Sequence, residues 1–221
     1  MVATLSADIV RSTSLRTEDL IELRKRLLGF FDKLGEDYLG FWGRIVRGDS
    51  IECFIPDYHY ALRIAVLVKL FVKKQAGSYE CSELLQRYGI RFSIGIGEIK
   101  YVNRSEDIIA GPAIYISGRN LDSISREGNV FSAIEVEGAT RETNHFLDSY
   151  VAMVNSIADS YSKKQAEVVY YKLLGFKERE ISERVGITQS AINIRASGAQ
   201  WGLLNTAILD FENLSIEKLC G

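Results

Sequence analysis

The sequence predicts an α+β protein, in which a domain of strands and helices precedes an all-helical domain. Through residue 139, segments in which apolar and polar residues alternate are interleaved with segments in which apolar residues recur at helical spacing. After Gly138 only the helical spacing continues. The predicted order is therefore β-α-β-β-α-β-α-β followed by helices alone, which is typical of two adjoining domains.

The alternating segments predict five strands, at residues 2–10, 43–47, 50–55, 90–96 and 129–136. Gly48 and Asp49 form the tight turn between the second and third strands, because glycine readily adopts positive φ. Helices are predicted at residues 17–34, 58–75 and 112–124, with Thr17 as an N-cap and Pro112 in a first turn. The first six elements have the ferredoxin-like order βαββαβ, an antiparallel sheet with both helices on one face.

The helical part divides into a connecting helix at residues 140–160 and a final domain at residues 161–221. Gly175 and Gly186 separate its three predicted helices, at residues 162–174, 177–185 and from Thr188 onward. An apolar stretch at residues 201–211 follows, and we expect it to pack on the first domain or on a second copy.

Composition excludes several classes of protein. The 221 residues carry a net charge of −2, which argues against a purely electrostatic nucleic-acid binder. No segment approaches the roughly 20 apolar residues of a membrane span, and the first residues lack the features of a signal peptide. Cys53, Cys81 and Cys220 are odd in number and widely spaced, which is typical of reduced thiols. We therefore expect a cytoplasmic protein without a membrane partner.

Two carboxylates occupy positions from which they could converge. Asp8 lies near the end of the first strand, and Asp49 lies at the tip of the hairpin, on strands that neighbour each other in a βαββ core. Two carboxylates with a backbone carbonyl suit Mg²⁺ or Mn²⁺. Ser12 and Thr13 precede a predicted helix N-terminus, where free N–H groups favour phosphate. These residues predict a site for a metal ion with a nucleotide or another phosphate ligand.

Four blocks of sequence resemble the catalytic domain of class III nucleotidyl cyclases, in that family's order: SADIVRST, RGDS, RFSIGIGE and GPAIYISGRNL. The resemblance implies metal ligation by Asp8, the Ile9 carbonyl and Asp49. It implies a transition-state and phosphate-binding role for Arg119, the one catalytic candidate, and a homodimer, because the family builds its site at a dimer interface.

The chain departs from the cyclase pattern at three positions. Tyr115 replaces the family's asparagine, and Ile45 and Ile108 replace its base-selecting lysine and aspartate. Loss of one such transition-state group costs about 10²–10³ in rate, so the pattern favours a catalytically weak or inactive domain. A purely structural interpretation stays open for the matching residues too: Asp8 as a turn cap, Asp49 as a turn residue, and Arg119 paired with Asp122 or Glu127.

The second pattern predicts a helix-turn-helix. Ile181, Val185, Ile187 and Ile192 have the spacing of its core, and Gly186 stands at the turn. The DNA-contacting candidates lie at the start of the second helix, which such modules place in the major groove: Thr188, Gln189, Ser190, Asn193 and Arg195. Glutamine and asparagine can pair with adenine through two hydrogen bonds.

The charge of this region leaves an alternative open. Residues 150–221 contain eight basic and eight acidic side chains, whereas DNA affinity depends on phosphate neutralisation. Lys163, Lys164, Lys172 and Arg195 could form a local basic face. The alternative is a helical hairpin that only packs or binds a protein.

The segment of residues 163–200 resembles region-four sigma and LuxR-type helix-turn-helix modules. The whole chain resembles the bacterial SatD-type family. The shared features are an Asp-Ile-Val start, a Gly-Asp hairpin, an Ile-Gly-Ile-Gly-Glu strand and a final Gly-Ile-x-Gln-Ser pattern. These resemblances imply a DNA-binding transcriptional regulator whose first domain senses a ligand or mediates dimerisation. The alternatives are a divergent metal-dependent cyclase or phosphoryl-transfer enzyme, and a protein-interaction scaffold.

Overall fold

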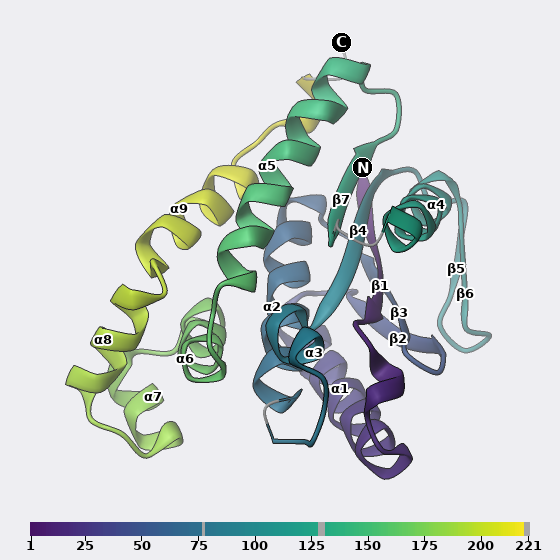
Figure 1. The fold of residues 1–221 in the computed structure, drawn as a ribbon. Helices are drawn as coiled ribbons and strands as arrows, with labels where there is room; N and C mark the ends of the chain where they lie inside the picture. Colours follow the sequence, from purple (N-terminus) through teal and green to yellow (C-terminus); the bar gives the residue numbers. More distant parts are fainter. Residues whose placement is uncertain (77, 128–130, 219–221) are drawn as a thin grey trace.

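A computed structural model describes residues 1–76, 78–127 and 131–218 (Figure 1). Five strands form one sheet in the order β2-β3-β1-β4-β7. Their bounds are Val2–Ile9 for β1, Trp42–Arg47 for β2, Ser50–Ile55 for β3, Ile90–Gly97 for β4 and Ser132–Val136 for β7. β1 pairs antiparallel with β3 and β4, whereas β7 joins β4 in parallel. The protein is thus a mixed α+β structure.

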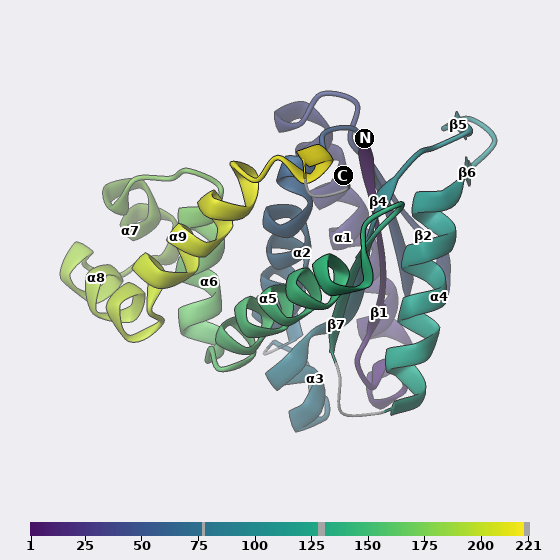
Figure 2. The same cartoon turned by 90° about the horizontal axis from the view of Figure 1, so that it is seen from above.

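Helices cover both faces of this sheet. α1 (Thr17–Asp37) and α2 (Ala61–Ala76) lie on one face, and α4 (Pro112–Glu127) lies on the other (Figure 2). On β1, Ala3, Leu5, Ala7 and Ile9 are buried among the residues of the main core. The alternate residues Thr4 and Ser6 contact α4 through Ser117. The period of two seen in the sequence therefore separates an apolar face from a polar one.

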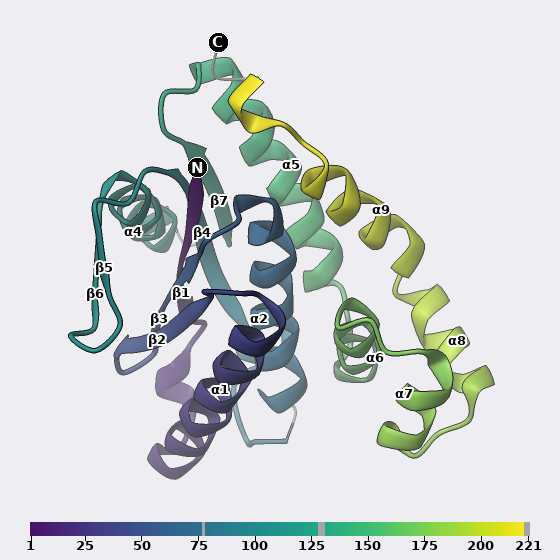
Figure 3. The same cartoon turned by 180° about the vertical axis from the view of Figure 1, so that it is seen from behind.

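The remaining helices follow β7: α5 (Arg141–Asp159), α6 (Lys163–Leu173), α7 (Glu178–Val185), α8 (Gln189–Gly198) and α9 (Trp201–Glu212). α5 and α9 lie side by side in Figures 1 and 3, and the Tyr150 hydroxyl donates to the Ala207 carbonyl at 2.6 Å. The main core continues from the sheet through α2 into these helices, ending at Phe211 and Ile216. None of the helices in the described part of the chain is both long and apolar enough to cross a membrane.

Polar contacts of three α2 side chains attach the C-terminal helices to α2. Arg63 forms an ion pair with Glu212 of α9 and donates to the Leu173 carbonyl at 3.1 Å. Lys69 and Lys73, both almost fully buried, reach the last turn of α5. Lys69 lies 2.6 Å from the Asp159 carboxylate, and Lys73 donates to the Ala158 and Asp159 carbonyls at 2.7 and 3.0 Å.

Several local expectations are corrected. The N-cap of α1 is Arg16, so Thr17 is the first helical residue. Residues 58–60 form a 3₁₀ turn (Tyr58–Tyr60), and α2 begins only at Ala61. The last predicted helix is divided at Gln200, whose φ is 51°. Asn129, the expected start of β7, and Cys220 lie outside the described residues.

Three elements are absent from the sequence-based prediction. α3 (Glu83–Tyr88) follows α2, and β5 (Tyr101–Asn103) pairs with β6 (Ile108–Ala110) in a separate hairpin. Each is six residues or fewer, too short to produce a clear hydrophobic period.

Candidate functional site

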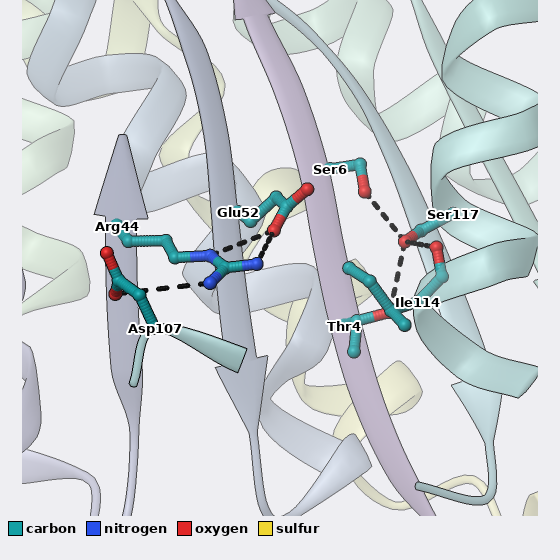
Figure 4. A network of polar contacts seen from close by, with 7 residues as sticks. All are labelled: Thr4, Ser6, Arg44, Glu52, Asp107, Ile114 and Ser117. Carbon is teal, nitrogen blue, oxygen red and sulfur yellow. Dashed lines mark hydrogen bonds and ion pairs between the residues drawn. The ribbon is translucent and has the colours of Figure 1, made fainter. Parts of the chain in front are cut away.

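A row of polar side chains occupies the sheet face under α4. The Ser117 hydroxyl lies 3.0 Å from that of Thr4 and 2.8 Å from that of Ser6 (Figure 4). The helix comes this close because β4 has no side chain at Gly95, where a Cβ atom would lie 2.1 Å from the Ala113 carbonyl oxygen. This close approach fixes α4 over β1 and β4.

Asp8 continues this row at the end of β1, but its carboxylate is already occupied. The β1–β4 register places Asp8 opposite Arg91. The Arg91 guanidinium donates to both carboxylate oxygens at 2.9 Å, and the Ser125 hydroxyl of α4 donates at 3.3 Å. Both members of the ion pair are about four-fifths buried. A bidentate pair of this kind neutralises Asp8 where the sequence predicts a free metal ligand.

Asp49 lies at the same end of the sheet, since the next residue, Ser50, is the β3 partner of Asp8. Its carboxylate accepts a hydrogen bond of 2.5 Å from the buried Ser12 hydroxyl. Thr13 is exposed. Ser12 and Thr13 belong to the 3₁₀ turn Ser12–Ser14 and precede the N-terminus of α1, from which Leu15 and Arg16 separate them.

Asp8, one of the residues predicted to hold a metal ion, does not offer a free carboxylate in this arrangement. Both carboxylate oxygens of Asp8 face the Arg91 guanidinium, and Ile9, whose backbone carbonyl is the third predicted ligand, is the last residue of β1. Among the described residues, no cluster of three or more potential metal-ligating side chains is present. A cation at Asp8 would have to displace Arg91, so we derive no catalytic step through a metal.

Within one chain, the Arg119 side chain does not contact the carboxylates of Asp8 and Asp49. Its side chain is 66% exposed on α4 and lies 3.4 Å from the Glu135 carboxylate, which also accepts from Asn120 at 2.8 Å. The partner is therefore Glu135 and not Asp122; the Glu127 side chain lies outside the described part of the structure. Tyr115, at the position of the cyclase asparagine, is also exposed.

The same sheet carries a second polar group, on its outer strands. Arg44 of β2 forms an ion pair of 2.5 Å with Glu52 of β3 and lies 3.9 Å from Asp107 of the β5–β6 hairpin (Figure 4). The Arg44 guanidinium also lies 5.3 Å from the centre of the Trp42 ring. These contacts hold the hairpin near the sheet and leave the Arg44 charge paired with carboxylates.

In the C-terminal part, α6, α7 and α8 pack around a small apolar core. Its fully buried members are Val168, Ile181, Ile192 and Ala196. α7 ends at Gly186, which has φ 71°, and the Thr188 side chain accepts from the Ala191 amide at 3.2 Å to begin α8. The left-handed residue reverses the chain at low cost because glycine has no Cβ.

The first two turns of α8 present polar side chains to solvent. Thr188, Gln189, Ser190 and Asn193 are exposed, and Arg195 is half-buried. Arg195 forms no ion pair with a residue that the structure describes. By contrast, Lys172 and Arg179 pair with Glu178 and Glu183 at 3.0 and 3.1 Å. Four of the five predicted DNA contacts therefore lie at the start of α8, and Arg195 lies in its last turn.

Sequence reasoning missed the three cations that organise the interior. Arg91 lies in the predicted strand at residues 90–96, but its partner Asp8 is 83 positions away in the sequence. Lys69 and Lys73 interrupt an apolar helix at a spacing of four residues. That spacing was the available signal, because two lysines on one face of a buried helix require buried acceptors.

Comparisons with known proteins give weak likenesses only. No family model and no curated protein matches the chain. Among solved structures, the guanylyl cyclase Cya2 is 13% identical with a TM-score of 0.38, covering 55% of this chain and 69% of its own. A bacterial light-regulated adenylyl cyclase is 14% identical with a TM-score of 0.42, covering 72% of this chain and 57% of its own. Likenesses of this strength do not place the chain in a family.

Proposed function

We propose that this protein is a DNA-binding regulator that reads DNA with α8. The observation that carries the proposal is the exposed polar start of α8, held by α7, Gly186 and the small core around Ile181 and Ile192. In a helix-turn-helix the second helix enters the major groove with its N-terminal side chains at base edges. Gln189 and Asn193 supply amides for adenine, and Thr188 and Ser190 supply hydroxyls for phosphate or base.

The charge distribution supports a modest, salt-sensitive affinity for a single chain. Lys172 and Arg179 are engaged by neighbouring glutamates, which leaves fewer cations to neutralise phosphates. A homodimer would double the number of contacts. We propose that the sheet part of the chain provides this pairing or senses a phosphate-bearing ligand. Its strand order, with β3 between β2 and β1, supports a ferredoxin-like arrangement of the cyclase type.

The test is binding of the full chain to labelled genomic fragments, followed by anisotropy over a range of salt concentrations. Asn193→Ala should weaken specific binding at least about fivefold, because a bidentate base contact contributes about 1–3 kcal/mol. Thr206→Ala, at an exposed position of the neighbouring α9, is the matched control and should leave affinity unchanged. No retention of any DNA at low salt would contradict the proposal and favour a protein-interaction scaffold.

A further inference from the structure

A groove of ≈ 550 Å³ lies where α2 and α3 meet the end of α5 and the start of α6, and none of the residues predicted to contact a metal ion, a nucleotide or DNA lines it. Three cationic side chains from three different elements line it: Lys73, Arg87 and Lys163. Two acidic residues, Glu83 and Asp159, also line it. The groove therefore gathers positive charge at the joint between the sheet layers and the C-terminal helices.

The acidic residues do not balance these cations. The Asp159 carboxylate is already engaged by Lys69 at 2.6 Å and by the Asn155 amide at 2.9 Å. Arg87 forms no ion pair with a described residue, and its guanidinium lies 5.1 Å from the Tyr88 ring centre. Burial lowers the pKa of Lys73, and the nearby charges of Lys69 and Arg87 lower it further. Only the exposed Glu83 remains to offset them.

Uncharged donors border the same groove. At the start of α6, the Ser162 hydroxyl accepts from the Gln165 amide, and the Ser162 carbonyl accepts from the Ala166 amide. The Lys163 and Lys164 amides have no acceptor in the described part of the chain. These two N–H groups open the 11-residue helix α6, whose N-terminal dipole favours an anion. Independently, Tyr161, which lines the groove and is 4% exposed, has a buried hydroxyl with no hydrogen-bond partner among the described residues.

We propose that this groove binds the phosphate group of a small anionic ligand, with Arg87, Lys163 and the first amides of α6 as its donors. The Lys163 ammonium donates to the Ser78 hydroxyl at 3.0 Å and keeps further N–H groups for a ligand. A dianion there would offset the charges of Arg87 and Lys163 and give acceptors to the Lys163 and Lys164 amides. The ligand would touch both α3, which packs on the sheet layer through α2, and α6, which begins the segment carrying α7 and α8. Binding would therefore stabilise the present orientation of α6 relative to α2.

The experiment is thermal unfolding and calorimetric titration of the full chain with inorganic phosphate, against chloride at equal ionic strength. Phosphate should raise the Tm progressively as its concentration rises above its Kd, and the calorimetric titration should saturate. The double variant Arg87→Gln/Lys163→Gln should weaken phosphate binding at least about tenfold, since it removes two charged hydrogen-bond donors. Arg87 is exposed and Lys163 begins a helix at the surface, so this variant should fold.

The control is Lys25→Gln/Arg104→Gln, which removes two exposed cations from α1 and from the β5–β6 loop. It should bind phosphate as the wild type does. The proposal is overturned if phosphate and chloride act alike on the wild type, or if the Arg87→Gln/Lys163→Gln variant retains full affinity. Because no DNA is present in the assay, its outcome is independent of the proposed DNA-binding function.

Discussion

Lys73 should make the stability of this protein depend on pH in the neutral range. Burial and the nearby charges of Lys69 and Arg87 lower the pKa of Lys73 to about 7, from 10.5. Asp159 acts in the opposite direction. Above pH 7 the unfolded chain therefore holds a proton on this amine that the folded protein has released. Because the unfolded state then binds more protons, the free energy of unfolding rises with pH.

The size of this effect follows from the pKa difference. The slope approaches about 1.4 kcal/mol per pH unit once the folded-state amine is neutral. Since the amine is half-protonated at pH 7, the gain from pH 7 to pH 9 is about 2 kcal/mol. Lys69, whose pKa is also lowered by burial, adds in the same direction. Above that range, the raised pKa values of buried tyrosines such as Tyr161 reverse the slope.

The assay is urea unfolding of the wild type and of Lys73→Met at pH 7, 8 and 9. Methionine preserves the apolar stem and removes the titrating group, so the variant should lose about 2 kcal/mol of the pH-dependent gain. Lys25→Met, at an exposed position of α1, controls for the loss of a lysine and should keep the wild-type slope. Identical slopes for Lys73→Met and the wild type would refute the reasoning, because Lys73 would then stay protonated in the folded protein.

Two further predictions concern the face of the sheet under α4. Arg91→Met should lower the free energy of unfolding by about 1–3 kcal/mol in urea titrations, because Asp8 is left largely buried and without its ion-pair partner. Adding Asp8→Asn to this variant should restore part of the lost stability. A double variant whose loss equals the sum of the two single losses would argue against the ion pair. Gly95→Ala should cost about 3 kcal/mol or more, because its Cβ would lie 2.1 Å from the Ala113 carbonyl oxygen. Gly118→Ala, a helical glycine with nothing within 4 Å, should instead raise the Tm; equal Tm changes for the two glycines would contradict the close approach of α4.

Much of the architecture follows from short-range patterns. Alternation in residues 2–10 and 90–96 predicts β1 and β4, and Gly48-Asp49 predicts the hairpin, because strand period and turn chemistry are local properties. The helical stripe at residues 58–75 predicts a buried helix, which α2 confirms. The exposed side chains at the start of α8 follow from the Thr188 cap and the spacing of its apolar residues. Their contact with DNA stays a prediction.

The sequence by itself determined where strands, helices and candidate charges lie along the chain, and the tertiary structure decided which charges meet. Asp8 and Asp49 share one end of the sheet as their strands predict, yet the β1–β4 register brings Arg91 onto Asp8. Arg119 faces Glu135, and two lysines within an apolar helix become buried against the end of α5. Such pairings join residues far apart in sequence, so they depend on strand register and helix packing, which no local period encodes.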